Sequence, residues 1–429
     1  MANFLHAPRG TLDVTPEQSY KWQYLEKKAH QAAADFGFEE IRFPTFEYTE
    51  LFARGVGDTT DVVQKEMYTF EDRGGRSITL RPEGTASTVR ALLQNGLAGG
   101  SLPLKFFYLI SCFRGERPQA GRLREFHQFG AELFGAANAS ADVELIELAN
   151  TFLTSLGVTG LRLEINSIGC PDCRKQYYAA LQAYFESRKD ELCDDCKKRL
   201  KSNPMRILDC KVPTCKEIAK DAPIVLDYLC DDCKAHFEEV KKRLSQAGFS
   251  YVINPRTVRG LDYYTRTVFE FIDEEQDLTV CGGGRYDGLV SQLGGPSLPG
   301  LGFGLGLERL LILMESKGLF FPPRPRGNIY LAPIGEKAAT AATALTRALR
   351  KSGISAETDL ISRSIKAQMK YANKHGFTYT VVIGDSELAK GEAILKSMKS
   401  DHEQLIPLGS EQFVSAVLAA DGVKQTKEG

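Results

Sequence analysis

No long apolar run occurs in this sequence. Nowhere in its 429 residues do about 18 apolar residues follow one another, the length that a membrane-spanning helix requires. The segment 1–10 has no apolar core followed by a cleavage site, so a secretory signal peptide is not predicted. These absences lead us to expect a cytoplasmic protein without a membrane partner.

Net charge is almost absent as well. The chain has 54 Lys and Arg against 55 Asp and Glu, a formal charge of -1. This balance excludes a protein that coats nucleic acid through bulk charge, but it allows a local basic surface. Residues 347–374 predict one, because seven basic and two acidic residues leave an excess of five positive charges there.

Two common kinds of nucleotide-binding loop are missing. The glycine-rich segments 281–288 and 300–309 fit neither the dinucleotide-binding fingerprint nor the Walker loop. A nucleotide-dependent dehydrogenase is therefore excluded. Glycines at alternate positions instead indicate a strand that passes very close to a flat ligand.

A proline-rich linker divides the chain. Three prolines fall within residues 321–327, where they prevent a helix from continuing. We expect residues 1–325 to form an α+β domain with an antiparallel sheet and a helical, cysteine-rich insertion at about 170–250. Residues 327–429 alternate between strand and helix patterns, which predicts a smaller α/β domain with a mostly parallel sheet.

The clearest local signal is a β-hairpin. Strands predicted at 105–114 and 124–134 are joined by a polar loop. Because alternate residues of a strand share a face, Gln128 and Glu132 point the same way on either side of Gly130 and form a floor for a ligand. Arg114 and Arg122 stand at the mouth of this floor, where planar guanidinium groups suit phosphate or carboxylate oxygens. For Arg114 alone, an exposed charged hairpin face explains the pattern equally well.

Candidate binding groups also precede a predicted helix at 86–94. Glu83 and Thr85 flank a glycine there. The carboxylate of Glu83 could cap the helix, or it could bind the ammonium group of a small substrate.

Two later segments carry further candidates. Residues 258–270 combine Arg259, Tyr263 and Tyr264 in a β-type segment with more polar groups than a buried structural strand usually carries. Arg309 begins a helix predicted at 306–317, where its charge opposes the helix dipole and calls for an anion.

Eight of the ten cysteines fall between residues 170 and 233. A cytoplasmic chain rarely keeps structural disulfides, so this group indicates metal ligands or reduced thiols. The spacing favours one four-cysteine zinc site made of Cys170, Cys173, Cys193 and Cys196. A second would consist of Cys210, Cys215, Cys230 and Cys233.

Arginines around a glycine-lined antiparallel floor resemble the arrangement of class II aminoacyl-tRNA synthetases. More narrowly, the chain resembles bacterial histidyl-tRNA synthetases over essentially its whole length. The segments that carry this resemblance are residues 80–86, 113–122, 126–130, 258–270, 281–288 and 302–309. The run Arg-Gly-Leu-Asp-Tyr-Tyr at 259–264 is the most specific of them, since other class II enzymes do not share it.

The resemblance implies a histidine–tRNA ligase. Such an enzyme activates L-histidine with ATP and Mg²⁺ to histidyl-adenylate, and then transfers the histidyl group to the 3′ end of tRNA(His). It implies a class II catalytic domain over 1–325 and an anticodon-binding domain over 327–429. It also implies a homodimer, with an interface motif near residues 42–50.

The resemblance further implies roles for individual residues. Arg114 and Arg259 would be catalytic and would stabilise the negative charge that builds on the α-phosphate. The residues expected to bind ATP are Arg114, Glu116, Arg122 and Arg309. The residues expected to bind histidine are Glu83, Thr85, Gln128, Glu132, Tyr263 and Tyr264. Gln119 is a candidate contact for the acceptor end of the tRNA.

A non-catalytic relative is the main alternative. It is the synthetase-like regulatory subunit of ATP phosphoribosyltransferase. Such relatives typically lack the anticodon-binding domain and lose the 259–264 run, whereas this chain retains both features. A histidine-dependent ATP–pyrophosphate exchange assay would separate the two functions.

Overall fold

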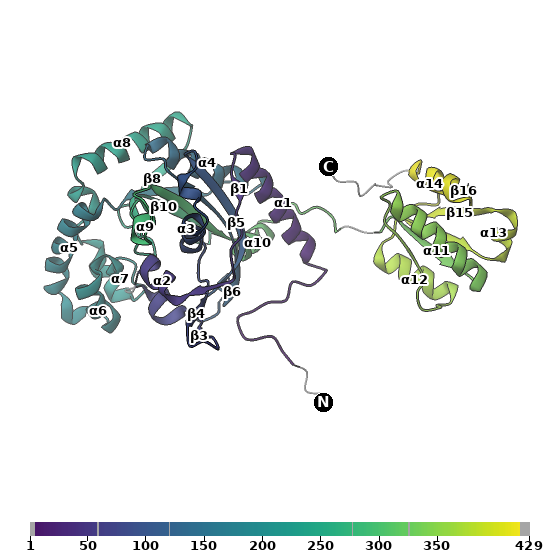
Figure 1. Ribbon diagram of the computed structural model, residues 1–429, viewed down its shortest axis with the longest axis horizontal. Helices are drawn as coiled ribbons and strands as arrows, with labels where there is room; N and C mark the ends of the chain where they lie inside the picture. The colour runs from purple at the N-terminus through teal and green to yellow at the C-terminus, as the bar shows by residue number, and fades with distance from the viewer. Residues whose placement is uncertain (1–4, 58–59, 120, 277, 325–326, 421–429) are drawn as a thin grey trace. The chain divides into compact units, whose positions relative to one another are not determined.

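The structure is a computed structural model that describes residues 5–57, 60–119, 121–276, 278–324 and 327–420. The chain divides into two compact units, Met1–Pro322 and Pro323–Gly429. Figure 1 shows each unit with its own sheet and helices, and each is described by itself.

A large sheet forms the centre of the first unit (Figure 1). In the described residues its strand order is β1-β5-β6-β11-β10-β9-β7-β8. The strands are β1 (Glu39–Glu40), β5 (Leu104–Phe113), β6 (Glu125–Phe134), β11 (Gly300–Gly306), β10 (Leu278–Arg285), β9 (Thr265–Asp273), β7 (Arg162–Ser167) and β8 (Tyr251–Ile253). Only the outermost strands β1 and β8 pair in parallel, so the prediction of an α+β fold with an antiparallel sheet is confirmed.

The predicted hairpin is confirmed as β5 and β6. The two strands pair antiparallel from Leu104 opposite Phe134 to Phe113 opposite Glu125. Their side chains alternate between two faces, as the strand period requires. Phe129 is buried in the core under the helices, whereas Gln128 lines a cavity on the opposite face.

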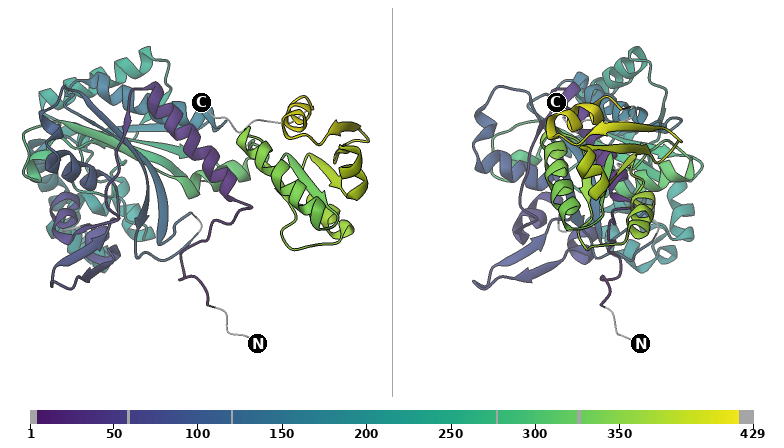
Figure 2. Two further views of the ribbon diagram at one scale, coloured as in Figure 1. Left: turned by 45° about the vertical axis from the view of Figure 1, so that its right-hand side comes forward. Right: turned by 90° about the vertical axis from the view of Figure 1, so that its right-hand side faces the viewer.

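Four helices cover the first face of the sheet. They are α1 (Ser19–Asp35), α4 (Ala139–Ser155), α8 (Asp231–Gln246) and α10 (Leu307–Ser316). All four contribute buried side chains to one core cluster with the sheet. Figure 2 shows α1, in purple, lying across this face. In α1 the helical spacing buries Leu25, Ala29 and Ala33 completely.

The opposite face carries shorter elements. They are α2 (Thr49–Val56), α3 (Thr85–Gln94), α9 (Leu289–Gln292), η1 (Val62–Glu66), η2 (Leu97–Gly99) and a small sheet of β2 (Phe46–Tyr48), β4 (Ser77–Leu80) and β3 (Thr69–Glu71). Residues 41–46 do not form one strand. Pro44 has no N–H for a ladder, and the chain leaves β1 before it joins β2 in the other sheet.

The insertion is helical, as the sequence predicts. Its elements are α5 (Pro171–Glu186), η3 (Lys189–Glu191), α6 (Asp194–Ser202), η4 (Pro204–Ile207), α7 (Pro213–Lys220), η5 (Val225–Tyr228) and α8. The insertion leaves the sheet after β7 and returns to it at β8, and these two strands pair with each other. The first and last parts of the insertion therefore lie side by side.

The second unit is a five-stranded sheet with helices. In the described residues the strand order is β13-β12-β14-β15-β16. The elements are β12 (Ile329–Pro333), α11 (Glu336–Lys351), β13 (Ala356–Thr358), α12 (Ile365–His375), β14 (Tyr379–Ile383), α13 (Asp385–Lys390), β15 (Glu392–Ser397), β16 (Glu403–Pro407) and α14 (Ser410–Leu418).

The predicted sheet of the second unit is partly wrong. β12, β13 and β14 pair in parallel, but β15 and β16 add two antiparallel strands. Residues 392–397 alternate between exposed and buried, the pattern of an antiparallel strand with one solvated face.

Membrane-spanning helices are not found in the described part of either unit. None of these helices combines the length and the hydropathy that a bilayer crossing requires.

Candidate active site

Glycines let functional side chains lie flat against the central strands. A Cβ at Gly282 on β10 would overlap the guanidinium group of Arg259, and a Cβ at Gly302 on β11 would overlap the carboxylate of Glu132. At these two glycines, side chains of the chain itself use the space that the sequence analysis assigns to a flat ligand.

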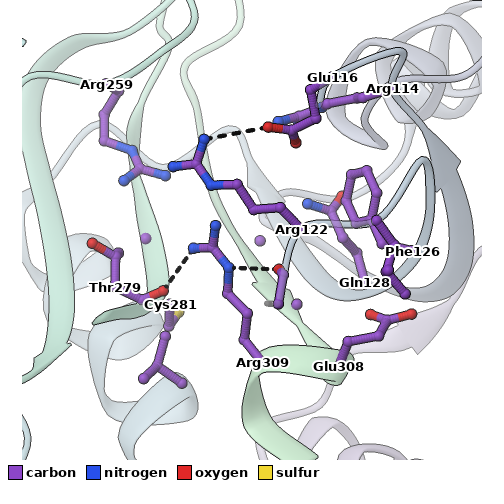
Figure 3. Close-up of a pocket in the computed structure, with 16 residues that line it drawn as sticks. Arg114, Glu116, Arg122, Phe126, Gln128, Arg259, Thr279, Cys281, Glu308 and Arg309 are labelled. Atoms are coloured by element: carbon purple, nitrogen blue, oxygen red, sulfur yellow. Dashed lines mark hydrogen bonds and ion pairs between the residues drawn. The ribbon is translucent and has the colours of Figure 1, made fainter. Parts of the chain in front are cut away.

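Four arginines from distant parts of the sequence line one cavity of about 170 Å³. Arg114 follows β5, Arg122 precedes β6, Arg259 lies in the loop before β9, and Arg309 belongs to α10. In Figure 3 the guanidinium groups of Arg122, Arg259 and Arg309 converge in the middle of the cavity. The sequence prediction that these residues meet is confirmed.

Each of these arginines is held by a neighbour. Arg114 donates its Nε to the backbone oxygen of Pro82 at 3.0 Å and lies over the ring of Phe126. Arg309 donates to the backbone oxygens of Gly121 and Thr279, both at 3.0 Å. These contacts fix the direction of each guanidinium group before any ligand arrives.

Carboxylates pair with the other two arginines. Arg122 contacts Glu116 at 3.3 Å, and Arg259 forms an ion pair with Glu270. Burial opposes the charge of Arg259, but the carboxylate of Glu270 raises its pKa above the ordinary value. Arg259 is therefore charged in the cavity.

The positive charges of the arginines in the cavity repel one another, and a bound anion would reduce this repulsion. Burial lowers the pKa of Arg309, and the positive charges of Arg122, Arg114 and Arg259 lower it further. Like charges cluster this closely only where an opposite charge compensates them. The lining therefore favours a multiply charged anion such as a polyphosphate.

A second group of buried polar side chains surrounds Glu132, on the sheet face that carries the cavity. The carboxylate of Glu132 is fully buried and accepts hydrogen bonds from the hydroxyls of Thr85 at 2.7 Å, Tyr108 at 2.9 Å and Tyr286. Burial raises the pKa of Glu132 to about 8, although the three hydroxyl donors act to lower it. This carboxyl group can hold or release a proton near neutral pH, and it offers oxygens to a polar ligand.

Tyr108 and Tyr286 are site residues that the sequence reasoning missed. Burial, and next the charge of Glu132, raise both tyrosine pKa values, so their hydroxyls stay protonated as donors. Strand alternation could have found Tyr108, since it pairs with Gly130 and shares the face of Glu132. A Cβ at Gly130 would overlap the ring of Tyr108, which explains the glycine.

Glu83 caps the start of helix α3, which is the first of the two roles considered for it. Its carboxylate accepts hydrogen bonds from the backbone N–H groups of Thr85 at 2.7 Å and Ala86 at 2.9 Å, at the start of α3. It also accepts the hydroxyl of Tyr263 at 3.4 Å. Burial raises the pKa of Glu83. Glu83 thus places a buried carboxyl group close to Tyr263 and the start of α3.

Tyr264 lies between the buried polar group, through Tyr263, and Arg259 of the arginine cavity. Its ring packs against Tyr263 at 4.8 Å between centroids, and the guanidinium carbon of Arg259 lies 5.9 Å from the ring centroid. These residues lie in a loop, because β9 begins only at Thr265. The prediction of a β-type segment from residue 258 is therefore wrong for residues 258–264.

Two further residues of the predicted site, Gln128 and Gln119, lie in different places. Gln128 lines the arginine cavity and accepts a hydrogen bond from the thiol of Cys112 at 3.3 Å. Gln119 is exposed in the loop between β5 and β6, where its backbone pairs with Arg122. Gln119 does not line the cavity, although its backbone is hydrogen-bonded to Arg122, which does.

The eight clustered cysteines are grouped differently from the prediction. The structure brings together Cys170, Cys173, Cys230 and Cys233, and separately Cys193, Cys196, Cys210 and Cys215. The prediction grouped the first four and the last four of these cysteines. It was wrong because the insertion starts and ends at the adjacent strands β7 and β8. The outer Cys-x₂-Cys pairs therefore meet each other.

In the second unit, most of the predicted basic surface is exposed. The exposed cations include Arg347 and Lys351 on α11, and Lys366 and Lys370 on α12. Arg363 instead forms an ion pair with Asp359 at 2.6 Å. The exposed cations suit contacts with a phosphate backbone.

The chain is similar to known proteins over nearly all of its length. A family model described as Histidyl-tRNA synthetase matches residues 10–310, and one described as Anticodon binding domain matches residues 328–419. The Histidine–tRNA ligase of Caldicellulosiruptor bescii is 53% identical over 406 residues, which are 94% of this chain and 96% of that protein. The Histidine–tRNA ligase of Clostridium perfringens is 51% identical over 414 residues, 96% of this chain and 99% of that protein.

A solved structure shows the same similarity. The crystal structure of apo S. aureus histidyl-tRNA synthetase matches with a TM-score of 0.82 and 38% sequence identity. The match covers 96% of this chain and 100% of that chain.

Proposed function

This chain belongs to the histidyl-tRNA synthetase family, and from that premise we propose how its residues bind and activate their substrates. It is a histidine–tRNA ligase with a class II catalytic domain and an anticodon-binding domain, as the sequence predicts. The reaction joins L-histidine and ATP into histidyl-adenylate with release of pyrophosphate, and then transfers the histidyl group to tRNA. The regulatory-subunit alternative is not supported, because both family models match this chain.

Histidine binds in the buried pocket around Glu132. An imidazole ring needs acceptors for its N–H groups and a close-fitting wall, and Glu132, Tyr264 and Gln128 supply them. The ammonium group of the substrate binds at Glu83 and Thr85, where a buried carboxylate favours a cation. Tyr263 lines the same pocket through its contact with Glu83. An analogue without imidazole N–H groups would leave these polar groups unpaired, which is a strong basis for selectivity.

ATP binds in the arginine cavity. Arg122 and Arg309 hold the outer phosphates, and Glu116 orients Arg122 through their ion pair. Arg114 and Arg259 lie nearer the histidine pocket, since Arg259 contacts Tyr264 and Arg114 is fixed by Pro82, directly before Glu83. This arrangement supports a triphosphate whose α-phosphate faces the histidine carboxylate.

Activation is a displacement at phosphorus. A carboxylate oxygen of histidine forms a bond to the α-phosphorus, and the bond to the pyrophosphate oxygen breaks. Negative charge on the α-phosphate oxygens increases during this step. Arg114 and Arg259 are fixed in advance by Pro82 and Glu270, so they stabilise this charge without reorganising.

The cavity also suits a magnesium ion bound with the nucleotide. Mg²⁺ usually takes one or two carboxylates together with phosphate oxygens and water. Glu66 and Glu116 line the wider cleft beside the arginines. Burial raises the pKa of Glu66, and the negative charges of Glu116 and Asp61 raise it further, so a cation fits this donor set. The ion would supply charge neutralisation for the phosphates.

Transfer RNA contacts both units in this proposal. The exposed cations on α11 and α12 bind the phosphate backbone of the anticodon stem-loop. Gln119 lies in an exposed loop at the mouth of the arginine cavity, which supports a contact with the acceptor end.

The enzyme acts as a cytoplasmic homodimer in this proposal. Phe46, Tyr48 and Phe70 on the small sheet are about half exposed, as expected for side chains that a second copy covers. The segment from Arg42 to Glu50, which leads into this sheet, belongs to the same surface.

The convergence of four guanidinium groups on one cavity, with the buried carboxylate of Glu132 on the same sheet, carries the proposal. The direct test is ATP–pyrophosphate exchange measured with each of the twenty amino acids in turn. Only histidine should promote exchange. Exchange with another amino acid, or no exchange by folded protein, would contradict the assignment of the pocket.

A further inference from the structure

The cysteines of the insertion form two sulfur clusters. The first cluster is Cys170, Cys173, Cys230 and Cys233, and the second cluster is Cys193, Cys196, Cys210 and Cys215. Within each cluster all four Sγ atoms lie within 4.8 Å of one another. All ten cysteines of the chain are free thiols, and the other two, Cys112 and Cys281, are buried elsewhere.

The sulfur separations match the edges of a metal tetrahedron. In a four-thiolate zinc site each Zn–S bond is about 2.3 Å, so neighbouring sulfurs lie about 3.8 Å apart. Three of the separations are 3.5 Å for Cys170 and Cys173, 4.0 Å for Cys170 and Cys230, and 3.9 Å for Cys193 and Cys210, and every other separation within a cluster is at most 4.8 Å. One ion per cluster would therefore contact all four sulfurs without rearrangement of the backbone.

Backbone groups support the thiolate form of these sulfurs. The N–H of Cys230 donates to Sγ of Cys173 at 3.1 Å, and the N–H of Cys193 donates to Sγ of Cys215 at 3.2 Å. Three Cys-x₂-Cys pairs begin a helix, with the first cysteine at the N-cap of α5, α6 or α8. N–H donors and the positive end of a helix favour negative sulfur, as metal ligands require.

We propose that each cluster binds one Zn²⁺ through four thiolates, giving two structural zinc ions per chain. A soft thiolate set with tetrahedral spacing selects zinc over the harder Mg²⁺ and Ca²⁺. The clusters lie outside the arginine cavity and the Glu132 pocket, so the ions take no part in the chemistry of activation.

The two zinc ions instead fix the loop that carries the catalytic residues. Next to Cys173 of the first cluster, Arg174 donates to the backbone oxygen of Tyr264 at 3.0 Å. Arg266, just beyond the loop, donates its N–H to the backbone oxygen of Gly169 at 2.9 Å. The first cluster thus anchors the C-terminal end of the loop.

The second cluster anchors the middle of the same loop. Between Cys196 and Cys210, Asn203 donates to the carboxylate of Asp262 at 3.0 Å, and Arg206 donates to the backbone oxygen of Gly260 at 2.5 Å. Gly260 directly follows Arg259. Given the proposed function, loss of zinc should therefore disturb Arg259 and Tyr264 without removing any substrate contact directly.

Metal counting tests the two sites and the pairing. Protein purified without chelator should contain two zinc ions per chain by elemental analysis, and Co²⁺ exchange should give the visible bands of tetrahedral cobalt thiolate. The double variant Cys170→Ser/Cys230→Ser should lose one ion, whereas Cys170→Ser/Cys193→Ser should lose both. Cys281→Ala is the matched control for the count and should keep both ions.

Three results would overturn the sites. They are protein without zinc, one ion per chain, and disulfides within the clusters by mass spectrometry. If Cys170→Ser/Cys230→Ser lost both ions and Cys170→Ser/Cys193→Ser lost only one, each ion would be bound by cysteines that follow one another in the sequence, contrary to the geometry. Metal content is measured without any assay of activity, so a failure of the proposed function leaves this test intact.

Arg206→Ala tests the positioning role in a variant that keeps all eight cysteines. It should retain two zinc ions and lower kcat for histidine-dependent exchange about tenfold or more, since small misplacements of catalytic groups have large effects. Lys216→Ala, an exposed substitution beside Cys215, is the control and should leave exchange unchanged. Unchanged exchange in Arg206→Ala would contradict the positioning role, and the zinc sites would be judged on the metal count alone.

Discussion

Glu132→Gln should remove a decrease in the free energy of unfolding that the wild type shows as pH rises. The carboxyl group is fully buried, and its pKa is raised from 4.5 to about 8. As pH rises above the ordinary value, the unfolded chain loses this proton while the folded chain keeps it. Glu132 therefore contributes stability that is fully present at low pH and is lost as pH rises through the folded pKa.

The size of the effect follows from the two pKa values. A difference from 4.5 to about 8 corresponds to roughly 5 kcal/mol in total, or about 1.4 kcal/mol for each pH unit. The amide that replaces the carboxyl group in the variant does not titrate, so the stability difference between wild type and variant isolates this group. From about pH 5.5 to about pH 7.5, the wild type should lose about 3 kcal/mol relative to the variant.

Urea unfolding followed by tryptophan fluorescence measures this difference. Trp22 is the single tryptophan, and it packs in the first unit with its ring 4.9 Å from that of His127. The signal therefore reports on the unit that contains Glu132. A stability difference that stays constant across this pH range would refute the reasoning, because it would mean that Glu132 is ionised throughout.

Three further predictions concern activity. Arg259→Ala should lower the rate of adenylate formation by about 100-fold or more with little change in the urea midpoint, and an equal loss of both would make Arg259 a structural residue. Gly302→Ala should lower histidine-dependent exchange by about 100-fold while ATP binding by calorimetry persists, because the new Cβ would overlap Glu132, and normal exchange would contradict the assigned pocket. Deletion of residues 323–429 should spare exchange but impair charging of full-length tRNA, and loss of exchange would contradict the independence of the first unit.

Local patterns predicted the elements that carry the site. The hairpin of β5 and β6 follows from strand alternation, and the alternating strand and helix patterns after residue 327 predict the α/β character of the second unit. The convergence of Arg114 and Arg122 is local to this hairpin, so it could be seen in the sequence. The approach of Arg259 and Arg309 was carried only by the family resemblance.

Contacts between distant segments account for what the sequence did not predict. Residues 258–264 form a loop although their aromatic content is typical of a strand, because Arg174, Asn203 and Arg206 of the insertion bind two of their backbone oxygens and the carboxylate of Asp262. The pairing of the cysteines depends on the adjacency of β7 and β8, which spacing along the chain does not reveal. Tyr286 reaches Glu132 across the sheet, and no local pattern joins these two residues.

The central claim is that a triphosphate and an imidazole occupy neighbouring sites on one sheet face. A crystal structure of the enzyme with histidine and a non-hydrolysable ATP analogue tests it most directly. The account predicts phosphate oxygens within hydrogen-bond distance of Arg114, Arg122, Arg259 and Arg309, with the imidazole against Glu132. Phosphates bound elsewhere, or a histidine side chain turned away from Glu132, would contradict it.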